Sequence, residues 1–222
     1  MPVDQCNENY AFFGLTVVRY RVNDDLGAVM SLLTLSPIII GVGYFTLMGF
    51  RRDLQTFCLA FGQLLDLVLN KVMKTAIAAP RPDLGSCPNT GHGMPSNHAQ
   101  FMFFFCTFCL LHIWLRTSWS RLEILLASAA LLGWGPAVAY SRIHLTCHSL
   151  EQVAAGSALG SATGALWFVF EDAVLRPLCP RVASWRVCEA LHAKDYSAVR
   201  HVLRHEREAV HGAAGRSHQK RE

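Results

Sequence analysis

The sequence predicts an all-α fold, a polytopic membrane bundle of about five transmembrane helices. Two observations lead to this prediction: the overall composition and a long uncharged stretch near the start of the chain. Of 222 residues, 52% are hydrophobic and only 16% are charged, whereas soluble domains carry about 25% charged residues. Leu26–Phe50 contains no charged residue and is long enough, at about 1.5 Å per residue, to cross about 30 Å of hydrocarbon.

Apolar segments of membrane-spanning length recur along the chain, separated by short polar loops. The expected spans are approximately Gly27–Phe50, Leu54–Ile77, Ala99–Leu115, Ile124–Tyr140 and Leu150–Phe170. The predicted organisation is an N-terminal segment over residues 1–26, a transmembrane core over residues 27–171 and a basic tail over residues 172–222. Within the tail, the spacing of Val199, Val202, Leu203 and Val210 indicates a short amphipathic helix that could lie on the membrane.

The loop charges orient the bundle. With five spans, the loops that contain Arg51, Arg52, Arg116 and Arg121 lie on the same side as the basic tail. By the positive-inside rule this side is cytosolic, so the N-terminal segment and the loops over residues 77–98 and 140–149 face the opposite compartment. Cys6 and Cys87 both fall on that opposite side, where they could form a disulfide.

Two patterns inside the spans indicate helix packing. Charged side chains in a membrane helix usually face the bundle interior, and the second span carries a polar stripe at helical spacing, which favours structural pairing over a role in tuning the lysine. Small residues at every fourth position let two helices approach closely, and the fifth span has such a ladder. The stripe is Asp66, Asn70 and Lys74, and the ladder is Gly156, Gly160 and Gly164.

Three short stretches carry chemistry, and all fall at ends of spans on the same predicted side. They read "KTAIAAPRP", "PSNH" and "SRIHLTCHSLEQ". Together they supply three cations, two histidines and a helix N-terminus, which are Lys74, Arg81, Arg142, His98, His148 and the amides after Ser96. Fixed cations and free N–H groups suit the oxygens of a transferring phosphoryl group, and two histidines allow one nucleophile and one general acid.

The order and internal spacing of these stretches resemble the type 2 phosphatidate phosphatase superfamily, whose pattern is K-x6-RP, PSGH and SR-x5-H-x3-D. Asn97 stands where that family usually has Gly. The runs "GMPSNHAQFMFFF" and "YSRIHLTCHSLEQV" are similar to the dolichyl-diphosphatase branch, and the likeness covers most of residues 14 to 190. A three-part match is far more specific than any single part.

The resemblance implies an enzyme that hydrolyses dolichyl diphosphate to dolichyl phosphate and inorganic phosphate through a phosphohistidine. It also implies residence in the endoplasmic reticulum membrane, with the site facing the lumen and the tail in the cytosol, where the enzyme recycles the carrier lipid of protein N-glycosylation. The expected partners are the polyprenyl diphosphate substrate and membrane lipids, with no nucleic acid. No metal or cofactor is expected, because the cations supply the positive charge.

The same resemblance assigns roles to single residues. His148 is the expected nucleophile, and His98 the acid for the leaving group and then the base for water. The expected phosphate-binding residues are Lys74, Arg81, Ser96, Asn97 and Arg142.

Gln152 stands where most of the superfamily has an Asp that orients the nucleophilic histidine. An amide can accept the ring N–H and fix the tautomer, although it cannot stabilise an imidazolium by charge. Glu151 is a rival for this role, since positions three and four after His148 both return to its helix face. Gln152 is preferred because it lies four residues after His148, at the position of the Asp in the family pattern.

Three other functions remain open at this point. The same chemistry could act on another lipid phosphate, such as phosphatidate or a shorter polyprenyl diphosphate. The chain could instead be a non-catalytic membrane scaffold. An anion transporter is disfavoured, because its cations would lie midway through the bilayer rather than at span ends.

Overall fold

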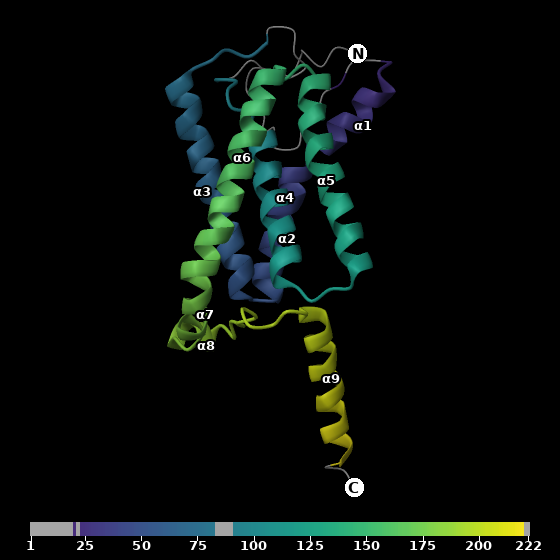
Figure 1. Ribbon diagram of the computed structural model, residues 1–222, viewed down its shortest axis with the longest axis vertical. Helices are drawn as coiled ribbons and strands as arrows, with labels where there is room; N and C mark the ends of the chain where they lie inside the picture. The colour runs from purple at the N-terminus through teal and green to yellow at the C-terminus, as the bar shows by residue number, and fades with distance from the viewer. Residues whose placement is uncertain (1–19, 21–22, 83–90, 220–222) are drawn as a thin grey trace, which may run out of the picture.

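The protein folds as a bundle of long helices with a helical tail below one end (Figure 1). A computed structural model describes residues 20, 23–82 and 91–219. Five helical runs in this part of the chain are long and apolar enough to cross a membrane. They are Asp25–Phe50, Leu54–Ile77, Asn97–Arg116, Arg121–His144 and Leu150–Ala183. The expected all-α class and the five spans are therefore confirmed.

The first span is interrupted. Two residues separate helix α1 (Asp25–Leu33) from α2 (Ser36–Phe50). Pro37 lies in the first turn of α2, where its missing N–H removes one hydrogen bond from a continuous helix. The single span expected over Gly27–Phe50 therefore consists of two helices.

Helix α4 (Asn97–Arg116) is the centre of the bundle. It contacts α2, α3 (Leu54–Ile77), α5 (Arg121–His144) and α6 (Leu150–Phe170). Its packing against α6 depends on the glycine ladder. A Cβ at Gly156 would lie 2.6 Å from the carbonyl oxygen of Ser96, and one at Gly160 would collide with the carbonyl of Gln100. The predicted close approach of this span to a neighbour is thereby confirmed.

Two members of the polar stripe of α3, Asp66 and Asn70, are buried in the bundle interior and are paired there. Gln100 donates from Nε2 to Asp66 Oδ1 at 2.8 Å, and the Thr163 hydroxyl donates to the same oxygen at 2.7 Å. Asn70 donates to Gln100 Oε1 at 2.7 Å and to the carbonyl of Pro95 at 3.4 Å. Structural pairing of Asp66, rather than contact with Lys74, is therefore what the structure shows. This network also fixes the chain just before α4.

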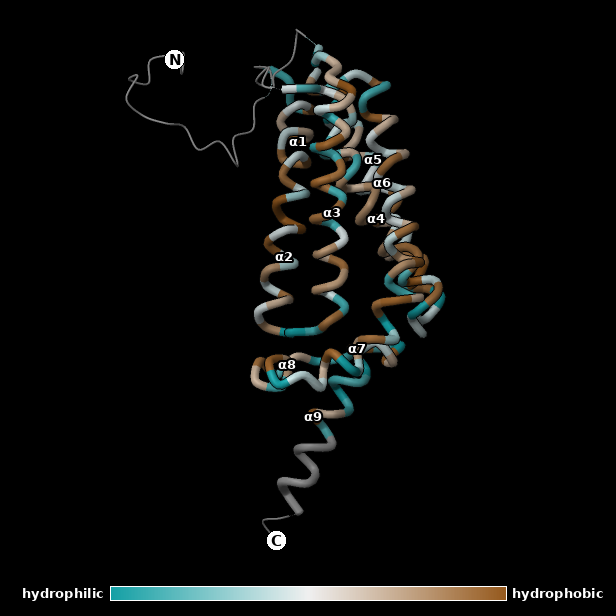
Figure 2. The backbone as a smooth tube through the Cα atoms, turned by 90° about the vertical axis from the view of Figure 1, so that its left-hand side faces the viewer, coloured by the Kyte–Doolittle hydropathy of each residue, from teal (hydrophilic) through white to brown (hydrophobic). Residues whose placement is uncertain are grey.

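The end of α6 runs on beyond the predicted core boundary. A π-helical turn over Glu171–Leu175 leads directly into α7 (Arg176–Ala183), followed by α8 (Arg186–Ala190) and α9 (Val202–Gln219). Figure 2 shows α8 beneath the bundle and α9 pointing away from it, along the long axis of the molecule. The expected tail helix exists, and it does not run across the end of the bundle.

The tail is attached to the loops of the bundle by backbone hydrogen bonds. Lys194 accepts from Leu54 at 3.0 Å and donates to Arg52 at 2.8 Å, and Arg200 accepts from Ser118 at 3.0 Å. The tail therefore closes one end of the bundle. The three chemistry-bearing stretches lie at the other end.

Candidate functional site

The three stretches predicted to carry chemistry meet at one end of the bundle. Lys74 is in the last turn of α3, Ser96 caps α4, and His148 lies between α5 and α6. Lys74 interacts electrostatically with both Arg81 and Arg142. His98 interacts in the same way with His148, Arg142 and Lys74. The structure thus brings both histidines and all three cations into one site on one face of the membrane bundle.

Gln152 connects the three stretches. Its side-chain amide donates to the carbonyl of Pro80 at 2.7 Å, next to Arg81. Its backbone carbonyl accepts from the N–H of Ser96 at 2.9 Å. Its side-chain oxygen lies 3.0 Å from Nδ1 of His148. Gln152 therefore positions three parts of the site, which are the segment before Arg81, the start of α4 and the expected nucleophile, His148.

These contacts determine which ring nitrogen of His148 carries the proton. Because the Gln152 amide group donates to Pro80, its oxygen must face His148. Nδ1 of His148 is then the donor, and Nε2 carries a lone pair. An aspartate at position 152 could accept from the ring but could not donate to the Pro80 carbonyl. The amide therefore makes a contact in this protein that the usual carboxylate cannot make.

The turn between α5 and α6 places Arg142 and His148 side by side. The backbone N–H groups of Cys147 and His148 both donate to the carbonyl of Arg142, at 3.0 and 3.2 Å. Thr146 takes a positive φ of 55°, which lets the chain fold back within five residues. Cys147 is disulfide-bonded, which ties down the residue next to His148. The number of residues between Arg142 and His148 in the sequence therefore corresponds to one closed turn, which connects α5 to α6.

Buried donors without a hydrogen-bond partner in the described part of the chain include the hydroxyl of Ser96, a residue that is fully buried, and Nε of Arg81, both in this site. A buried polar group without a partner is costly, so such groups usually have a function. A phosphate oxygen would satisfy both donors, and the free N–H groups at the start of α4 favour the same ligand.

The other expected site residues are placed as follows. Asn97 is the first residue of α4 and has no positive φ, so a side chain is tolerated where the family usually has Gly. Glu151 is exposed, whereas Gln152 is buried against His148. The structure therefore favours Gln152 over Glu151 as the residue that orients the imidazole. Cys6 and Cys87 lie outside the described residues.

Burial, together with the positive charges of Arg81, Arg142 and Lys74, lowers the pKa of His148 to about 4, against the opposing effect of the hydrogen bond to Gln152. Burial also lowers the pKa of Arg81. His148 is consequently neutral at physiological pH, which is the state that a nucleophilic imidazole requires.

Sequence reasoning missed two residues that shape the site, Pro80 and Gly93. Pro80 contributes only a carbonyl, which no side-chain pattern reveals. Gly93 lies so close to Gln152 that a Cβ there would come within 2.6 Å of its side-chain amide. The signal for Gly93 was its position two residues before "PSNH".

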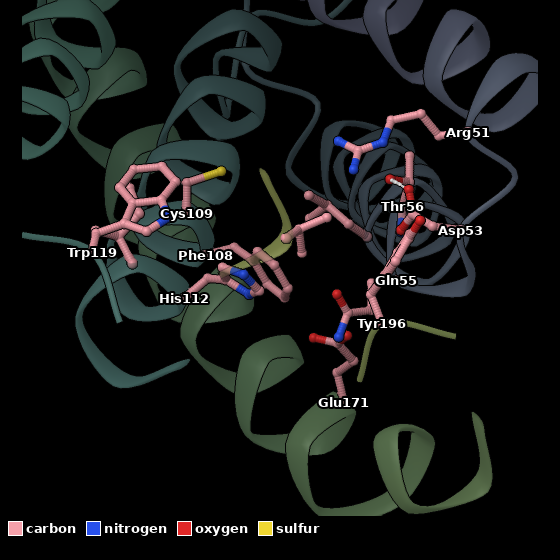
Figure 3. A pocket seen from close by; sticks show the side chains of 13 residues that line it. Arg51, Asp53, Gln55, Thr56, Phe108, Cys109, His112, Trp119, Glu171 and Tyr196 are labelled. Carbon is pink, nitrogen blue, oxygen red and sulfur yellow. Dashed lines mark hydrogen bonds between the residues drawn. The ribbon is translucent and has the colours of Figure 1, made fainter. Parts of the chain in front are cut away.

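A cavity of about 310 Å³ lies at the tail end of the bundle (Figure 3). Its charged side chains are already used within the protein. Arg51 pairs with Glu206 at 2.9 Å, Asp53 accepts from the backbone and hydroxyl of Thr56, and Glu171 pairs with Arg116 at 2.7 Å. These three charged side chains are thus already paired, in contrast to Lys74 and Arg81 at the other end, which form no ion pair within the described residues.

The fold and the site together define a membrane-embedded phosphatase family. The model of the PAP2 superfamily matches residues 55–176, and the chain belongs to this family. A crystal structure of a PAP2-type phosphatidylglycerolphosphate phosphatase from Bacillus subtilis shares the fold, with a TM-score of 0.58 at 20% identity. The alignment covers 72% of this chain and 82% of that one.

Relatives with higher sequence identity point to one group within this family. The chain is 39% identical over 198 residues to Dolichyldiphosphatase 1 of Rhinolophus ferrumequinum and 38% identical over 198 residues to Dolichyldiphosphatase 1 of Homo sapiens. Each alignment covers 85% of this chain and 83% of the relative. The likeness thus extends beyond the family model, and the predicted resemblance to dolichyl-diphosphatases is confirmed.

Proposed function

We propose that this protein hydrolyses the terminal phosphate of dolichyl diphosphate, yielding dolichyl phosphate and inorganic phosphate. The observation that carries the proposal is the position of Gln152, which leaves the lone pair of His148 on Nε2, in a site with three cations and the unpaired donors of Ser96 and Arg81. The high identity to dolichyldiphosphatases supports the choice of lipid.

In the first step, Nε2 of His148 attacks the terminal phosphorus and the bond from phosphorus to the bridging oxygen breaks. A phosphohistidine forms, and dolichyl phosphate leaves with a proton from His98. Arg81, Lys74 and Arg142 stabilise the charge on the transferring group, together with the Ser96 hydroxyl and the amide of Asn97. Gln152 holds the ring by accepting the Nδ1 proton.

In the second step, His98 removes a proton from water, and the resulting hydroxide attacks the phosphohistidine. The phosphorus–nitrogen bond breaks, inorganic phosphate forms and His148 returns to its neutral state. An amide suffices as the orienting group because the leaving group of the first step is a phosphate monoester. Such a group departs far more readily than an alkoxide, so less activation of the nucleophile is needed.

We further propose that the site faces the lumen of the endoplasmic reticulum and that the tail is cytosolic. The loops after the first and third spans, which contain arginines, lie at the same end as the tail, opposite the turn between α5 and α6 (Figure 1). An excess of Lys and Arg favours the cytosolic side. At the lumenal face the enzyme would recycle the carrier lipid released during protein N-glycosylation.

The direct test is phosphate release by the purified protein in detergent micelles. Dolichyl diphosphate, a shorter polyprenyl diphosphate and phosphatidate are compared, each with and without excess chelator. Release from dolichyl diphosphate at least about tenfold faster than from phosphatidate, equal in chelator, is the expected result. Preferential hydrolysis of phosphatidate would contradict the proposed substrate, and no release from any lipid would favour the scaffold.

A further inference from the structure

The start of α4 lacks the side-chain cap that the next two helices have. Ser120 before α5 and Ser149 before α6 each accept a hydrogen bond from a backbone N–H in the first turn of their helix. Ser96, in the same position before α4, accepts none, and its buried hydroxyl has no partner in the part of the chain that the structure describes. Since the Ser96 side chain does not secure the start of α4, other groups must hold it in place.

Two neighbouring helices hold this segment from opposite sides. On the α6 side, the N–H of Ser96 donates to the carbonyl of Gln152 at 2.9 Å. On the α3 side, Nδ2 of Asn70 donates to the carbonyl of Pro95 at 3.4 Å. Asn70 is 3% exposed and Pro95 is fully buried, so water does not compete for this contact. The residue just before Ser96 is thereby attached to α3.

The orientation of the Asn70 amide is determined by its neighbours. Nε2 of Gln100 lies 3.0 Å from the backbone carbonyl of Asp66 and 2.8 Å from its Oδ1. A backbone carbonyl can only accept, so the nitrogen of the Gln100 side chain faces Asp66 and its oxygen faces Asn70, at 2.7 Å. Nδ2 of Asn70 then has one hydrogen for Gln100 and one for the carbonyl of Pro95. Both hydrogens of this buried amide are used.

The same helix face carries one of the cations of the site. Lys74 follows Asn70 by four residues on α3, which is about 6 Å along the helix axis. The contact between Asn70 and Pro95 therefore also fixes the position of this part of α3 relative to the start of α4.

We propose that Asn70 is a positioning residue for phosphoryl transfer. By holding the carbonyl of Pro95, it keeps the Ser96 hydroxyl and the first free N–H groups of α4 directed at the phosphate. The inference rests on the proposed function, in which these donors bind the terminal phosphate of the lipid. Asn70 acts through the start of α4 and not by contact with the substrate.

The test substitutes Asn70→Leu, which has a similar shape and no hydrogen to donate to either acceptor. Misplacement of groups near the reacting atoms by about 1 Å can cost about 10²-fold, so we expect kcat to fall about 10–100-fold. The inhibition constant of inorganic phosphate should rise about tenfold, because hydrogen bonds to a charged group are lost. Phosphate release from dolichyl diphosphate, with and without added phosphate, measures both quantities.

Gln63→Leu is the matched control. Gln63 lies seven residues before Asn70 on the same face of α3, about 10 Å further from the site. It is 2% exposed, and its amide contacts the carbonyl of Phe101 on α4 at 3.5 Å. Gln63→Leu should leave kcat and the phosphate inhibition constant within twofold of wild type, even where it lowers the unfolding temperature as much as Asn70→Leu. Equal losses of kcat in both variants would indicate a general packing role and overturn the inference.

A double variant tests whether Asn70 acts through Ser96. Asn70→Leu should lower kcat by a smaller factor in the Ser96→Ala background than in wild type, because one of the positioned donors is already gone. Multiplicative losses, or a kcat for Asn70→Leu within twofold of wild type, overturn the inference. Absence of phosphate release by wild type, or full activity of His148→Ala, would instead contradict the proposed function.

Should Asn70→Leu be poorly folded, Asn70→Asp provides the test. An acid at this position keeps the shape of the amide and has at most one hydrogen to donate, whereas Gln100 and Pro95 each accept one. A fall in kcat of about tenfold is expected for the folded protein. A kcat within twofold of wild type would overturn the role of Asn70.

Discussion

The two ends of the bundle use their basic side chains differently. At the tail end, Arg116 pairs with Glu171 at 2.7 Å and Asp172 at 3.2 Å, and Arg51 pairs with Glu206 at 2.9 Å. At the other end, three cations act on His148, and no ion pair within the described residues includes Lys74 or Arg81. Positive charge that is neutralised internally supports the fold, whereas positive charge left over is available to an anionic substrate.

The largest effect is expected at the tail end, on stability. Arg116→Ala leaves Glu171 buried without its partner, since both side chains are no more than 5% exposed. Breaking a buried pair by removing one member costs about 3–5 kcal/mol of unfolding free energy. Thermal unfolding in detergent should show this loss, while kcat of the surviving folded protein stays within a few-fold of wild type. A large fall in kcat without loss of stability would contradict the claim that the basic side chains at the tail end support the fold rather than catalysis.

Arg81→Ala should lower kcat and leave stability unchanged, which is the reverse of the outcome expected for Arg116→Ala. Removal of one preorganised donor to a transferring group costs about 10²–10³-fold in kcat. Arg81 lies half-buried among other cations, so its loss should not lower the unfolding temperature. Arg81→Lys should recover only part of the rate, because a lysine cannot make forked contacts to phosphate. Full activity of the lysine variant would show that charge alone is needed.

Gly93→Ala tests the position of Gln152. The added methyl group would lie within 2.9 Å of three side-chain atoms of Gln152. Displacement of a group near the reacting atoms by about 1 Å can cost about 10²-fold, so a fall of this order in kcat is expected. Gly133→Ala is the matched control, since a Cβ there meets no atom within 4 Å. Equal activities of the two variants would show that the Gln152 contact is dispensable.

The pH dependence of kcat/KM sharpens the comparison, because it reports the ionisation of His148 at the site end of the bundle. Because burial and neighbouring cations lower its pKa to about 4, the neutral nucleophile persists until the pH falls through about 4. Gln152→Glu places an anion against the ring, which favours the imidazolium and moves this acid limb to higher pH. Wild type and variant are measured on one substrate, so ionisation of the lipid is common to both. An unchanged limb would show that another group controls it.

Much of this architecture follows from the sequence. The apolar runs predict the spans, because membrane-spanning length and the absence of charge leave few alternatives. The three stretches predict the candidate site, because their spacing reflects one closed turn between Arg142 and His148 and one helix start at Ser96. The glycine ladder, which includes Gly156 and Gly160, predicts the tight contact that α6 makes with α4.

Contacts made by backbone groups could not be predicted in this way. Pro80 contributes a carbonyl to Gln152, 72 residues away in the chain, and a carbonyl has no sequence signature. The pairing of Arg116 with Glu171 depends on the π-helical turn after α6, which the apolar pattern does not reveal. The docking of the tail on the loops also consists of backbone hydrogen bonds.

The measurement that tests the central claim most directly is a rapid-quench experiment with dolichyl diphosphate labelled in its terminal phosphate. The account predicts an acid-labile, base-stable label on the protein, recovered in the peptide that contains His148 and absent in His148→Ala. Release of labelled phosphate at the wild-type rate with no labelled protein at any time, or a label on another residue, would contradict it.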